Sequence, residues 1–269
     1  MIDAHVHFWK LDRGDYGWIT PARPILAKDY LPHDFHQVIS GTSVTGCIAV
    51  QAAPTETDTE FLLASAAEHS FIKGVVGWTD LTDLACRGQL DRWQAQSVFK
   101  GIRPMAGMQA GPEWLGDSHA VGLRELAKRG LVLDALALPH HVKGIATVAK
   151  AHDVLQIVIN HAAKPKPDDL AQWADDMSTL SGLENVICKL SGLTQQSSDP
   201  DHQARVRDVL LAVFGPDRLI WGSDHPVLLE TFTYAGWLDT TQNLLSVLPV
   251  EEQTKVTSHT AARVYGIVQ

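Results

Sequence analysis

The chain repeats one pattern along its whole length: a short apolar run, then a longer segment with apolar residues at helical spacing. The apolar runs are nearly continuous rather than strictly alternating, which is typical of parallel strands buried on both faces. Eight such runs predict strands, at residues 2–7, 46–51, 74–79, 97–103, 131–138, 155–160, 185–191 and 218–224.

The segments between these runs carry helix signals. Thr57 with Glu60 three residues later predicts a helix start, and Gly130 predicts a helix end. Pro167 and the acids beside it suit a first helical turn. The predicted helices lie at residues 57–69, 118–130, 164–180, 199–215 and 237–248.

Eight strands alternating with helices over 269 residues predict a single (β/α)8 TIM barrel covering residues 1–269. A Rossmann-like sheet is the main alternative, but no GxGxxG follows the first strand. The segment 8–45 is too long for a plain connection between a strand and a helix, and it is rich in turn formers and aromatic residues. We expect it to be a substrate lid.

Composition narrows the class of protein. The formal net charge is −9, which argues against a nucleic-acid surface. The three cysteines are too few and too scattered for a disulfide framework, so a reduced, cytoplasmic setting is expected. The sequence shows no export-signal pattern and no apolar run of membrane-spanning length, so no membrane partner is expected.

Polar residues with chemical capability gather where the predicted strands end. In such barrels the carboxyl ends of the strands form the active site. His5 and His7 share one face of the first strand, and their imidazoles could ligate one metal ion or bracket one polar substrate group. The other residues at strand ends are Trp78, Arg103, His161, Lys189, Ser191, Asp224 and His225. Lys189, if it points into the barrel, needs a carboxylate partner such as Asp224.

Six motifs carry a family resemblance: IDAHVHFW, FKGIRP, NHAAKP, CKLSGL, WGSDHPV and the closing TAARVYG. Their order and spacing resemble the amidohydrolase superfamily of metal-dependent hydrolases, and most of all its sugar-lactonase branch. The resemblance implies a site of His5, His7, His161 and Asp224. It implies at most one divalent metal ion, zinc for preference, held by His5, His7 and Asp224, or no metal at all.

The resemblance also implies a reaction, the opening of a sugar-acid lactone of the L-fucono, L-rhamnono or L-galactono type. Asp224 would act as general base, while His5, His7 and His161 polarise the carbonyl directly or through one metal ion. The expected partner is therefore a small sugar lactone, and a homodimer is an open alternative to a monomer. The residues expected to contact the substrate are Arg103, Lys164, Trp9, Trp18, Trp78 and His225.

Three alternatives stay open at this point. A metal-dependent decarboxylase of the same superfamily would keep the two histidines of the first strand, the later histidine and the aspartate. A pyrone-dicarboxylate lactonase would need several cations for two carboxylates, and only Arg103 and Lys164 stand out in the sequence. An inactive ligand-binding barrel is the non-enzymatic alternative.

Overall fold

The computed structural model describes residues 1–105 and 110–267, and it contains one eight-stranded parallel sheet. Each strand pairs in parallel with the next one along the chain, in the order β1 to β8. The strands are β1 (Ile2–Val6), β2 (Gly46–Val50), β3 (Ile72–Gly77), β4 (Phe99–Ile102), β5 (Val132–Ala135), β6 (Ile157–Ile159), β7 (Val186–Leu190) and β8 (Leu219–Trp221).

The sheet closes because the segment after β8 returns to β1. The His7 amide donates to the His225 carbonyl at 2.7 Å, and the Asp224 amide donates to the His5 carbonyl at 2.9 Å. The buried Asp3 carboxylate strengthens this seam, since it accepts hydrogen bonds from the amide of Ser223 and the hydroxyl of Tyr234. The predicted (β/α)8 barrel is confirmed.

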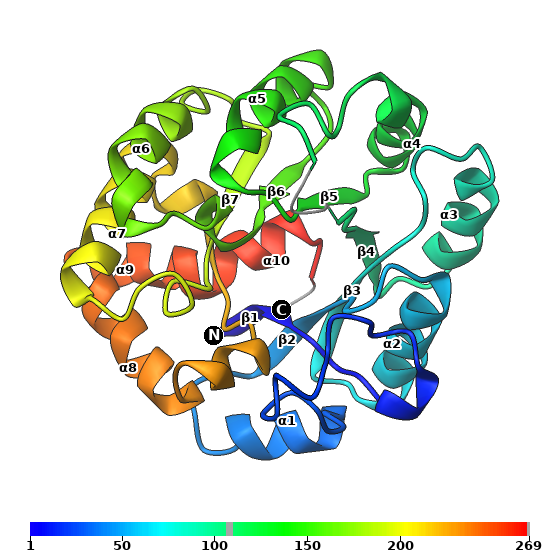
Figure 1. Ribbon diagram of the computed structural model, residues 1–269, viewed down its shortest axis with the longest axis horizontal. Coiled ribbons are helices and arrows are strands. Elements are labelled where there is room, and N and C mark those ends of the chain that lie inside the picture. The colour runs from blue at the N-terminus through cyan, green and yellow to red at the C-terminus, as the bar shows by residue number, and fades with distance from the viewer. Residues whose placement is uncertain (106–109, 268–269) are drawn as a thin grey trace.

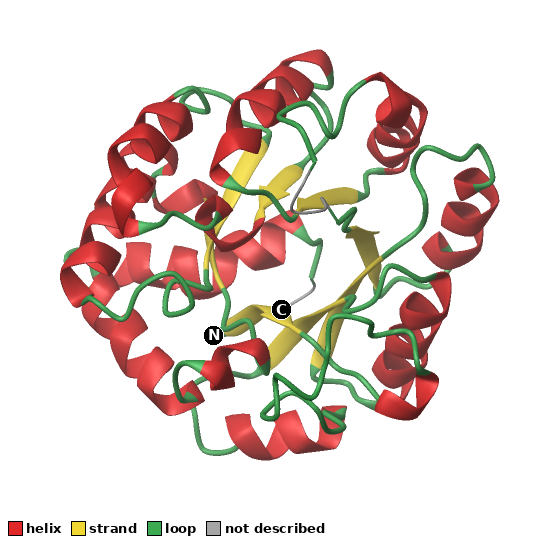
Figure 2. Ribbon diagram, in the orientation of Figure 1, coloured by secondary structure: helices red, strands yellow, loops and turns green. Residues whose placement is uncertain are grey.

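An outer ring of helices surrounds the strands (Figures 1 and 2). Their apolar faces pack on the outward-facing side chains of the sheet in one large core. The helices of the ring are α1 (Pro32–Ile39), α2 (Glu56–Glu68), α3 (Cys86–Gln94), α4 (Ala120–Arg129), α5 (Val142–Ala151), α6 (Leu170–Ser178), α7 (Pro200–Phe214) and α8 (Tyr234–Leu245). No helix in residues 1–105 and 110–267 has the length and apolar character needed to cross a membrane.

The end of the chain closes one end of the barrel. Helix α9 (Val250–Thr254), a π-helical turn (Lys255–His259) and α10 (Thr260–Val264) follow one another there. Ala261, Ala262 and Tyr265 pack in one cluster with apolar side chains from the strands, and α10 lies behind the strands in the centre of Figure 1. The interior of the barrel is therefore a packed core whose other end holds the polar strand ends.

The segment 8–45 folds back on itself before β2 begins. Trp9 and Tyr30 pair through their backbones, and their rings pack in a small cluster with Tyr16 and Leu26. The Tyr16 hydroxyl donates to the buried Asp58 carboxylate on α2 at 2.9 Å, which ties this segment to the barrel.

All eight predicted strands are present, although most are shorter than the apolar runs that predicted them. The predicted start of the first helix at Thr57 is wrong. Helix α2 begins at Glu56, and its N-cap is Thr55, whose hydroxyl accepts a hydrogen bond from the Asp58 amide. Both threonines fit the capping preference, and only the backbone geometry decides between them.

Candidate active site

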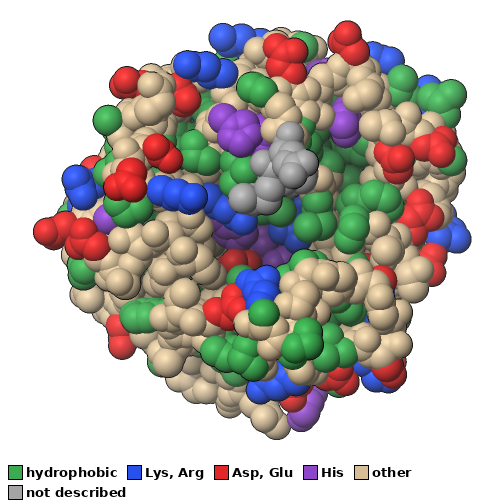
Figure 3. Space-filling model, viewed as in Figure 1, with side chains coloured by type: hydrophobic (Ala, Val, Ile, Leu, Met, Phe, Trp, Pro, Cys, Tyr) green, Lys and Arg blue, Asp and Glu red, His purple; other side chains and the backbone are tan. Residues whose placement is uncertain are grey.

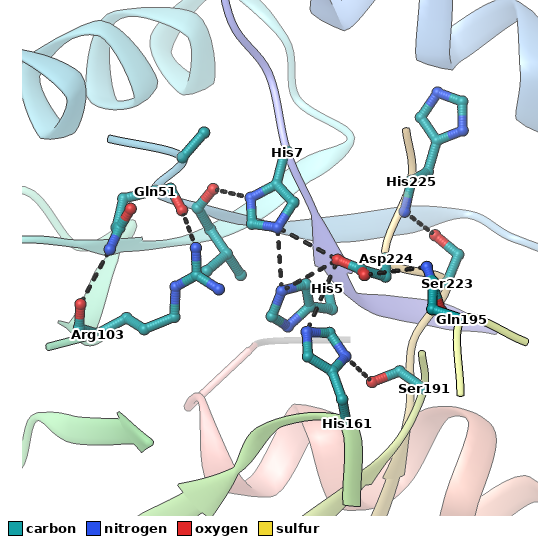
Figure 4. Close-up of polar contacts among 12 residues, drawn as sticks. His5, His7, Gln51, Arg103, His161, Ser191, Gln195, Ser223, Asp224 and His225 are labelled. Carbon is teal, nitrogen blue, oxygen red and sulfur yellow. Dashed lines mark hydrogen bonds and ion pairs between the residues drawn. The ribbon is translucent and has the colours of Figure 1, made fainter. Parts of the chain in front are cut away.

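Four predicted site residues meet at the carboxyl ends of the strands (Figure 4). His5 lies on β1 and His7 follows it, while His161 follows β6 and Asp224 follows β8. Each of the four is at most 6% exposed. Barrel closure brings them together because β1 and β8 are neighbours across the seam.

The three imidazoles converge on one carboxylate oxygen. The distances to Asp224 Oδ1 are 3.3 Å from His7 Nε2, 3.6 Å from His5 Nε2 and 3.7 Å from His161 Nε2. His5 Nε2 lies 3.2 Å from His7 Nε2. The other carboxylate oxygen, Oδ2, accepts a hydrogen bond from the Gln195 side chain at 3.2 Å.

The backbone that presents His161 is strained. His161, Ala162, Ala163 and Lys164 have φ values of 53°, 51°, 57° and 57°, which makes one turn of left-handed helix from residues other than glycine. Asp224 is also left-handed, with a φ of 64°. Such conformations cost about 1–2 kcal/mol per residue, and they cluster at functional sites. The strain therefore supports a functional reading of the NHAAKP and SDHP motifs.

Hydrogen bonds behind the imidazoles orient them. His7 Nδ1 donates to the Val50 carbonyl at 2.7 Å, so the His7 Nε2 atom faces the site. His161 Nδ1 bonds to the Ser191 hydroxyl at 2.8 Å, which turns its Nε2 atom toward Asp224. Partners of this kind fix ring orientation in metal sites and in acid–base sites alike.

Burial and neighbouring charges set the ionisation of the site. Burial acts to raise the pKa of Asp224, but His161, His7 and Lys164 outweigh it and lower that pKa to about 2. Burial lowers the pKa of His161 to about 3. Burial also lowers the pKa of Arg103, to about 10. At neutral pH the site therefore holds a carboxylate, a neutral His161 and a guanidinium cation.

A small cavity of about 170 Å³ opens beside Asp224. It lies on the face where His, Lys and Arg side chains gather around a central hollow (Figure 3). Its lining consists of His7, Trp18, Arg23, Ala52, Arg103, Met105, Leu136, His161, Lys164, Asp224 and Val227. The segment 8–45 supplies Trp18 and Arg23, so it forms part of the cavity wall.

Two cations face this cavity without a carboxylate partner in hydrogen-bond contact. Arg103 donates to the Gln51 carbonyl, but its buried Nε atom has no partner in the structure. Within residues 1–105 and 110–267, the Lys164 ammonium group has no hydrogen bond or ion pair, and burial lowers its pKa. Arg23, by contrast, is paired with Glu230. Unpaired buried donors are costly, so Arg103 and Lys164 are suited to binding an electron-rich ligand group.

Three residues expected to contact the substrate do not line the cavity. Trp9 is fully buried and donates to the Lys28 carbonyl. Trp78 follows β3 and is held through its backbone by Thr59. His225 turns away from Asp224 (Figure 4) and packs against the rings of Tyr30, Phe35 and Tyr234. These three side chains lie outside the lining of this cavity, and their contact with the substrate stays a prediction.

Sequence reasoning missed several residues of this site. Gln51 directly follows β2, so its position at a strand end was a usable signal. Arg23 and Gln195 lie in irregular segments, and no sequence pattern marks them. Lys189 does point into the barrel, but its carboxylate partner is Asp134 at 2.5 Å rather than Asp224.

The donor set fits one metal ion. Imidazole nitrogen and carboxylate oxygen are zinc ligands, and zinc–ligand distances of about 2.0–2.2 Å place tetrahedral ligand atoms roughly 3.4 Å apart. The three distances of 3.3 to 3.7 Å from Asp224 Oδ1 to the imidazoles match that spacing, as does the 3.2 Å between the Nε2 atoms of His5 and His7. Among the residues that the structure describes, His5, His161 and Asp224 each offer one ligand atom, and these three atoms all lie within 4.8 Å of one another. His7 Nε2 lies 3.3 Å from the Asp224 carboxylate.

A closed eight-stranded barrel with histidines and an aspartate at its strand ends has the architecture of a barrel enzyme whose site lies at the strand ends. The family model for amidohydrolases matches residues 2–267, and the chain belongs to this family.

Similar proteins carry more specific names. The chain is 35% identical over 246 residues to an L-fucono-1,5-lactonase of Burkholderia ambifaria, covering 88% of this chain and 85% of the relative. It is 32% identical to an L-fucono-1,5-lactonase of Burkholderia multivorans, with coverage of 99% and 96%. A crystal structure of an amidohydrolase from B. multivorans with bound zinc superposes with a TM-score of 0.94, at 31% identity and 99% coverage of both chains.

Proposed function

We propose that this protein hydrolyses the lactone of a sugar acid, and that the substrate is a six-membered L-fucono-type lactone. The observation that carries the proposal is the convergence of three histidine Nε2 atoms on one Asp224 oxygen beside the cavity. Two relatives named L-fucono-1,5-lactonase, at 35% and 32% identity, support the choice of substrate.

Asp224 is the general base of the proposed reaction. It is a carboxylate at neutral pH, and its Oδ1 atom faces the space where a water molecule must attack the lactone carbonyl. The low pKa makes it a weak base, so the carbonyl must be strongly activated. Gln195 holds the other oxygen and thereby fixes the direction in which the carboxylate accepts the proton.

Activation of the carbonyl falls to the donors around the cavity. Arg103 offers an unpartnered Nε–H, and Lys164 offers an ammonium group. As water attacks, the carbonyl oxygen becomes an oxyanion, and donors already in place stabilise it without reorganisation. Loss of one such donor costs roughly 100–1000-fold in rate in other enzymes.

Ring opening completes the proposed reaction. The tetrahedral intermediate collapses, the bond from the carbonyl carbon to the ring oxygen breaks, and the leaving alkoxide takes a proton. Asp224 holds the proton that it removed from water, so it can return that proton to the ring oxygen. Trp18 offers an apolar wall against one face of the sugar ring.

A divalent metal ion would be held by the histidine nitrogens and Asp224, and when bound it would act as a Lewis acid on the carbonyl oxygen. The steps assigned above to Asp224, Arg103 and Lys164 do not depend on it.

The test is an acid-release assay over a panel of aldonolactones, run on the purified protein with and without a chelator. Hydrolysis of L-fucono-1,5-lactone that survives chelation is the expected result, and it would show that the protein's own donors suffice. Loss on chelation with recovery by zinc would make the metal essential. The absence of turnover on every lactone would contradict the proposal.

The panel should include a lactone that carries a free carboxylate besides its ester group, because the side chains of Arg103 and Lys164 have no carboxylate partner. Faster turnover of the acidic lactone than of the neutral one would overturn the L-fucono assignment while leaving the reaction class in place. Carbon dioxide release from an aromatic acid would favour a decarboxylase instead.

A further inference from the structure

Three cationic side chains line the cavity, and they differ in whether a carboxylate neutralises them. Arg23, Arg103 and Lys164 all belong to the lining. In the part of the chain that the structure describes, Arg103 and Lys164 form no ion pair, whereas Arg23 pairs with Glu230. Burial lowers the pKa of Lys164, Asp224 raises it, and the charges of Arg103 and Arg23 lower it further, so the three cations act on one another. Three available cations in one cavity would favour an anionic ligand.

Glu230 occupies one hydrogen-bonding edge of the Arg23 guanidinium. Arg23 Nε donates to Glu230 Oε1 at 2.9 Å, and Arg23 Nη2 donates to Glu230 Oε2. This two-pronged contact is the geometry in which arginine binds a carboxylate most specifically. While Glu230 holds this edge, a carboxylate of a ligand cannot bind there.

Trp18 covers a face of the same guanidinium. Arg23 Cζ lies 4.9 Å from the centre of the Trp18 ring. The Trp18 indole N–H donates to the Ala52 carbonyl at 2.7 Å, which holds the ring in the cavity wall. Because Trp18 and Glu230 take up one face and one edge of its guanidinium, Arg23 contributes surface to the cavity wall more than available charge.

Glu230 belongs to the segment that presents Asp224. It ends a short 3₁₀ helix (Val227–Glu230) that follows β8. The Leu228 amide donates to the Asp224 carbonyl at 2.9 Å, and Val227 lines the cavity. Glu230 itself does not belong to the lining, and no catalytic step described above uses it. It can therefore change the charge of the site without touching the reacting atoms.

The balance of charges suits a neutral ligand. Arg103 and Lys164 face one negative charge, which moves from Asp224 to the carbonyl oxygen during the proposed reaction. A free carboxylate on the ligand would add a second negative charge beside the first. Arg23 is the remaining cation of the lining, and Glu230 already neutralises it.

We propose that Glu230 is a specificity-determining residue, which neutralises Arg23 and thereby makes the cavity prefer a neutral lactone over a lactone that carries a free carboxylate. The choice between two lactones rests on the proposed function. The preference for neutral over anionic ligands does not.

A purely structural role for the ion pair is the competing explanation. Arg23 lies in the segment 8–45 and Glu230 in the loop after β8, so their contact also ties these two segments together. A structural tie predicts that breaking the pair from either side has the same effect. Neutralisation predicts opposite effects, because loss of Glu230 frees a cation, whereas loss of Arg23 leaves a carboxylate without its partner.

The first experiment measures kcat/KM of the full chain for two lactones of the same ring size. One is L-fucono-1,5-lactone, and the other is an aldaric-acid 1,5-lactone with a carboxylate in place of the methyl group. Wild type should turn over the neutral lactone faster. Glu230→Gln should raise the acidic-to-neutral ratio at least about tenfold, since it frees a charge in a partly buried site. Arg23→Gln should lower the ratio.

The same direction of change in both variants would leave the pair as a structural tie and overturn the proposal. So would a wild-type protein that prefers the acidic lactone.

Two further variants separate charge from contact. The double variant Arg23→Gln/Glu230→Gln lacks the ion pair but keeps the balance of charge, so its ratio should return close to the wild-type value. A double variant that behaves like Glu230→Gln would contradict the proposal. Glu125→Gln is the matched control, because it removes a carboxylate that pairs with Arg129 on α4, in the outer ring. It should leave the ratio unchanged.

Anion affinity supplies a readout that does not need turnover. Calorimetric titration with tricarballylate, an unreactive tricarboxylate, should show binding to Glu230→Gln that is at least about fivefold tighter than to wild type. Equal affinity in the two proteins would overturn the proposal. If Glu230→Gln does not fold, Arg23→Gln supplies the test with the opposite sign, and it should bind tricarballylate more weakly than wild type.

These outcomes separate this proposal from the proposed function. A protein that hydrolyses no lactone but binds tricarballylate more tightly in Glu230→Gln would keep the role of Glu230 and lose the lactonase. An active lactonase with the same acidic-to-neutral ratio in every variant would do the opposite.

Discussion

At the scale of single residues, the site combines one carboxylate, neutral imidazoles and two unpaired cations in a buried cavity. Asp224 is the only acid that lines the cavity among the residues the structure describes. Arg103 and Lys164 line the same cavity, yet neither side chain forms an ion pair with Asp224. Both are therefore available to stabilise an oxyanion on the substrate. This balance favours a reaction in which negative charge moves from the base to the substrate oxygen.

The ionisation of these residues predicts the pH profile of the metal-free enzyme. Asp224 is ionised above about pH 2, His161 is neutral above about pH 3, and Arg103 stays charged below about pH 10. None of these three groups changes its protonation between about pH 5 and pH 8, so none of them should produce an inflection in kcat/KM for lactone hydrolysis across that range. The measurement is initial-rate kinetics with spontaneous hydrolysis subtracted. An inflection in that range that is lost in His161→Gln would mean that His161 titrates during the reaction, which would contradict the prediction.

At the scale of elements, the left-handed turn from His161 to Lys164 shapes the site. It places both His161 and Lys164 on the cavity wall from a single turn after β6. The loop after β7 makes room for it, because Gly192 lies directly against the His161 side chain. A Cβ atom at Gly192 would lie 2.9 Å from His161 Cβ, Cγ and Nδ1, closer than real Cβ contacts allow.

Gly192→Ala should therefore damage catalysis as well as stability. Gly192 has a φ of +66°, so alanine costs about 1–2 kcal/mol from backbone strain alone, and the clash must also displace His161. We expect kcat to fall at least about tenfold, as measured by the lactone assay alongside thermal unfolding.

Gly130→Ala is the matched control for this prediction. Gly130 has a φ of +64° and ends α4, but a Cβ atom there would meet nothing within 4 Å. It should lose a similar amount of stability and keep its kcat. Equal losses of kcat in the two variants would mean that the contact with His161 is unimportant.

The sequence predicted the strands well, but it did not predict the exact start of α2 or the left-handed turn after β6. Continuous apolar runs identified all eight strands, because burial on both faces leaves no other pattern. The start of α2 was wrong by two residues, since Thr55 and Thr57 have the same capping chemistry. The left-handed turn at His161 was not predicted, because alanine and lysine carry no signal for positive φ.

At the scale of the whole molecule, the end of the chain and the active site are connected through the barrel interior. Tyr265 lies just after α10 at one end, and it bonds to Asp134, which bonds to Lys189 below His5. The residues from both chain ends thus share one buried network.

The expectations of a single domain over residues 1–269 and of a homodimer stay predictions.

Tyr265→Phe should destabilise the whole barrel. The substitution leaves Asp134 Oδ1 buried without its donor, which costs about 1–3 kcal/mol of the free energy of unfolding. For a chain of this size the melting temperature should fall by about 2–10 °C, as measured by calorimetry. Tyr30→Phe, which removes a hydroxyl bonded to the Ile25 carbonyl in the 8–45 segment, should cost less. A smaller effect at Tyr265 than at Tyr30 would contradict the importance of the buried network.

The sequence by itself determined the barrel and the residues that gather at its strand ends, while their chemical roles stay predictions. Strand periodicity placed His5, His7, His161 and Asp224 at strand ends, and parallel closure requires all such ends to meet at one face. The order of residues carries this information, because each apolar run marks one strand and each strand pairs with the next one along the chain.

Only the tertiary structure decided which way side chains point and what lies behind them. It turned His225 and Trp9 away from the cavity, brought Arg23 into it, and gave Lys189 the partner Asp134 in place of Asp224. These outcomes depend on contacts between residues tens to hundreds of positions apart. A contact such as that of Lys189 Nζ with His5 Nδ1, at 3.3 Å, depends on tenths of an ångström, and no sequence pattern encodes such a distance.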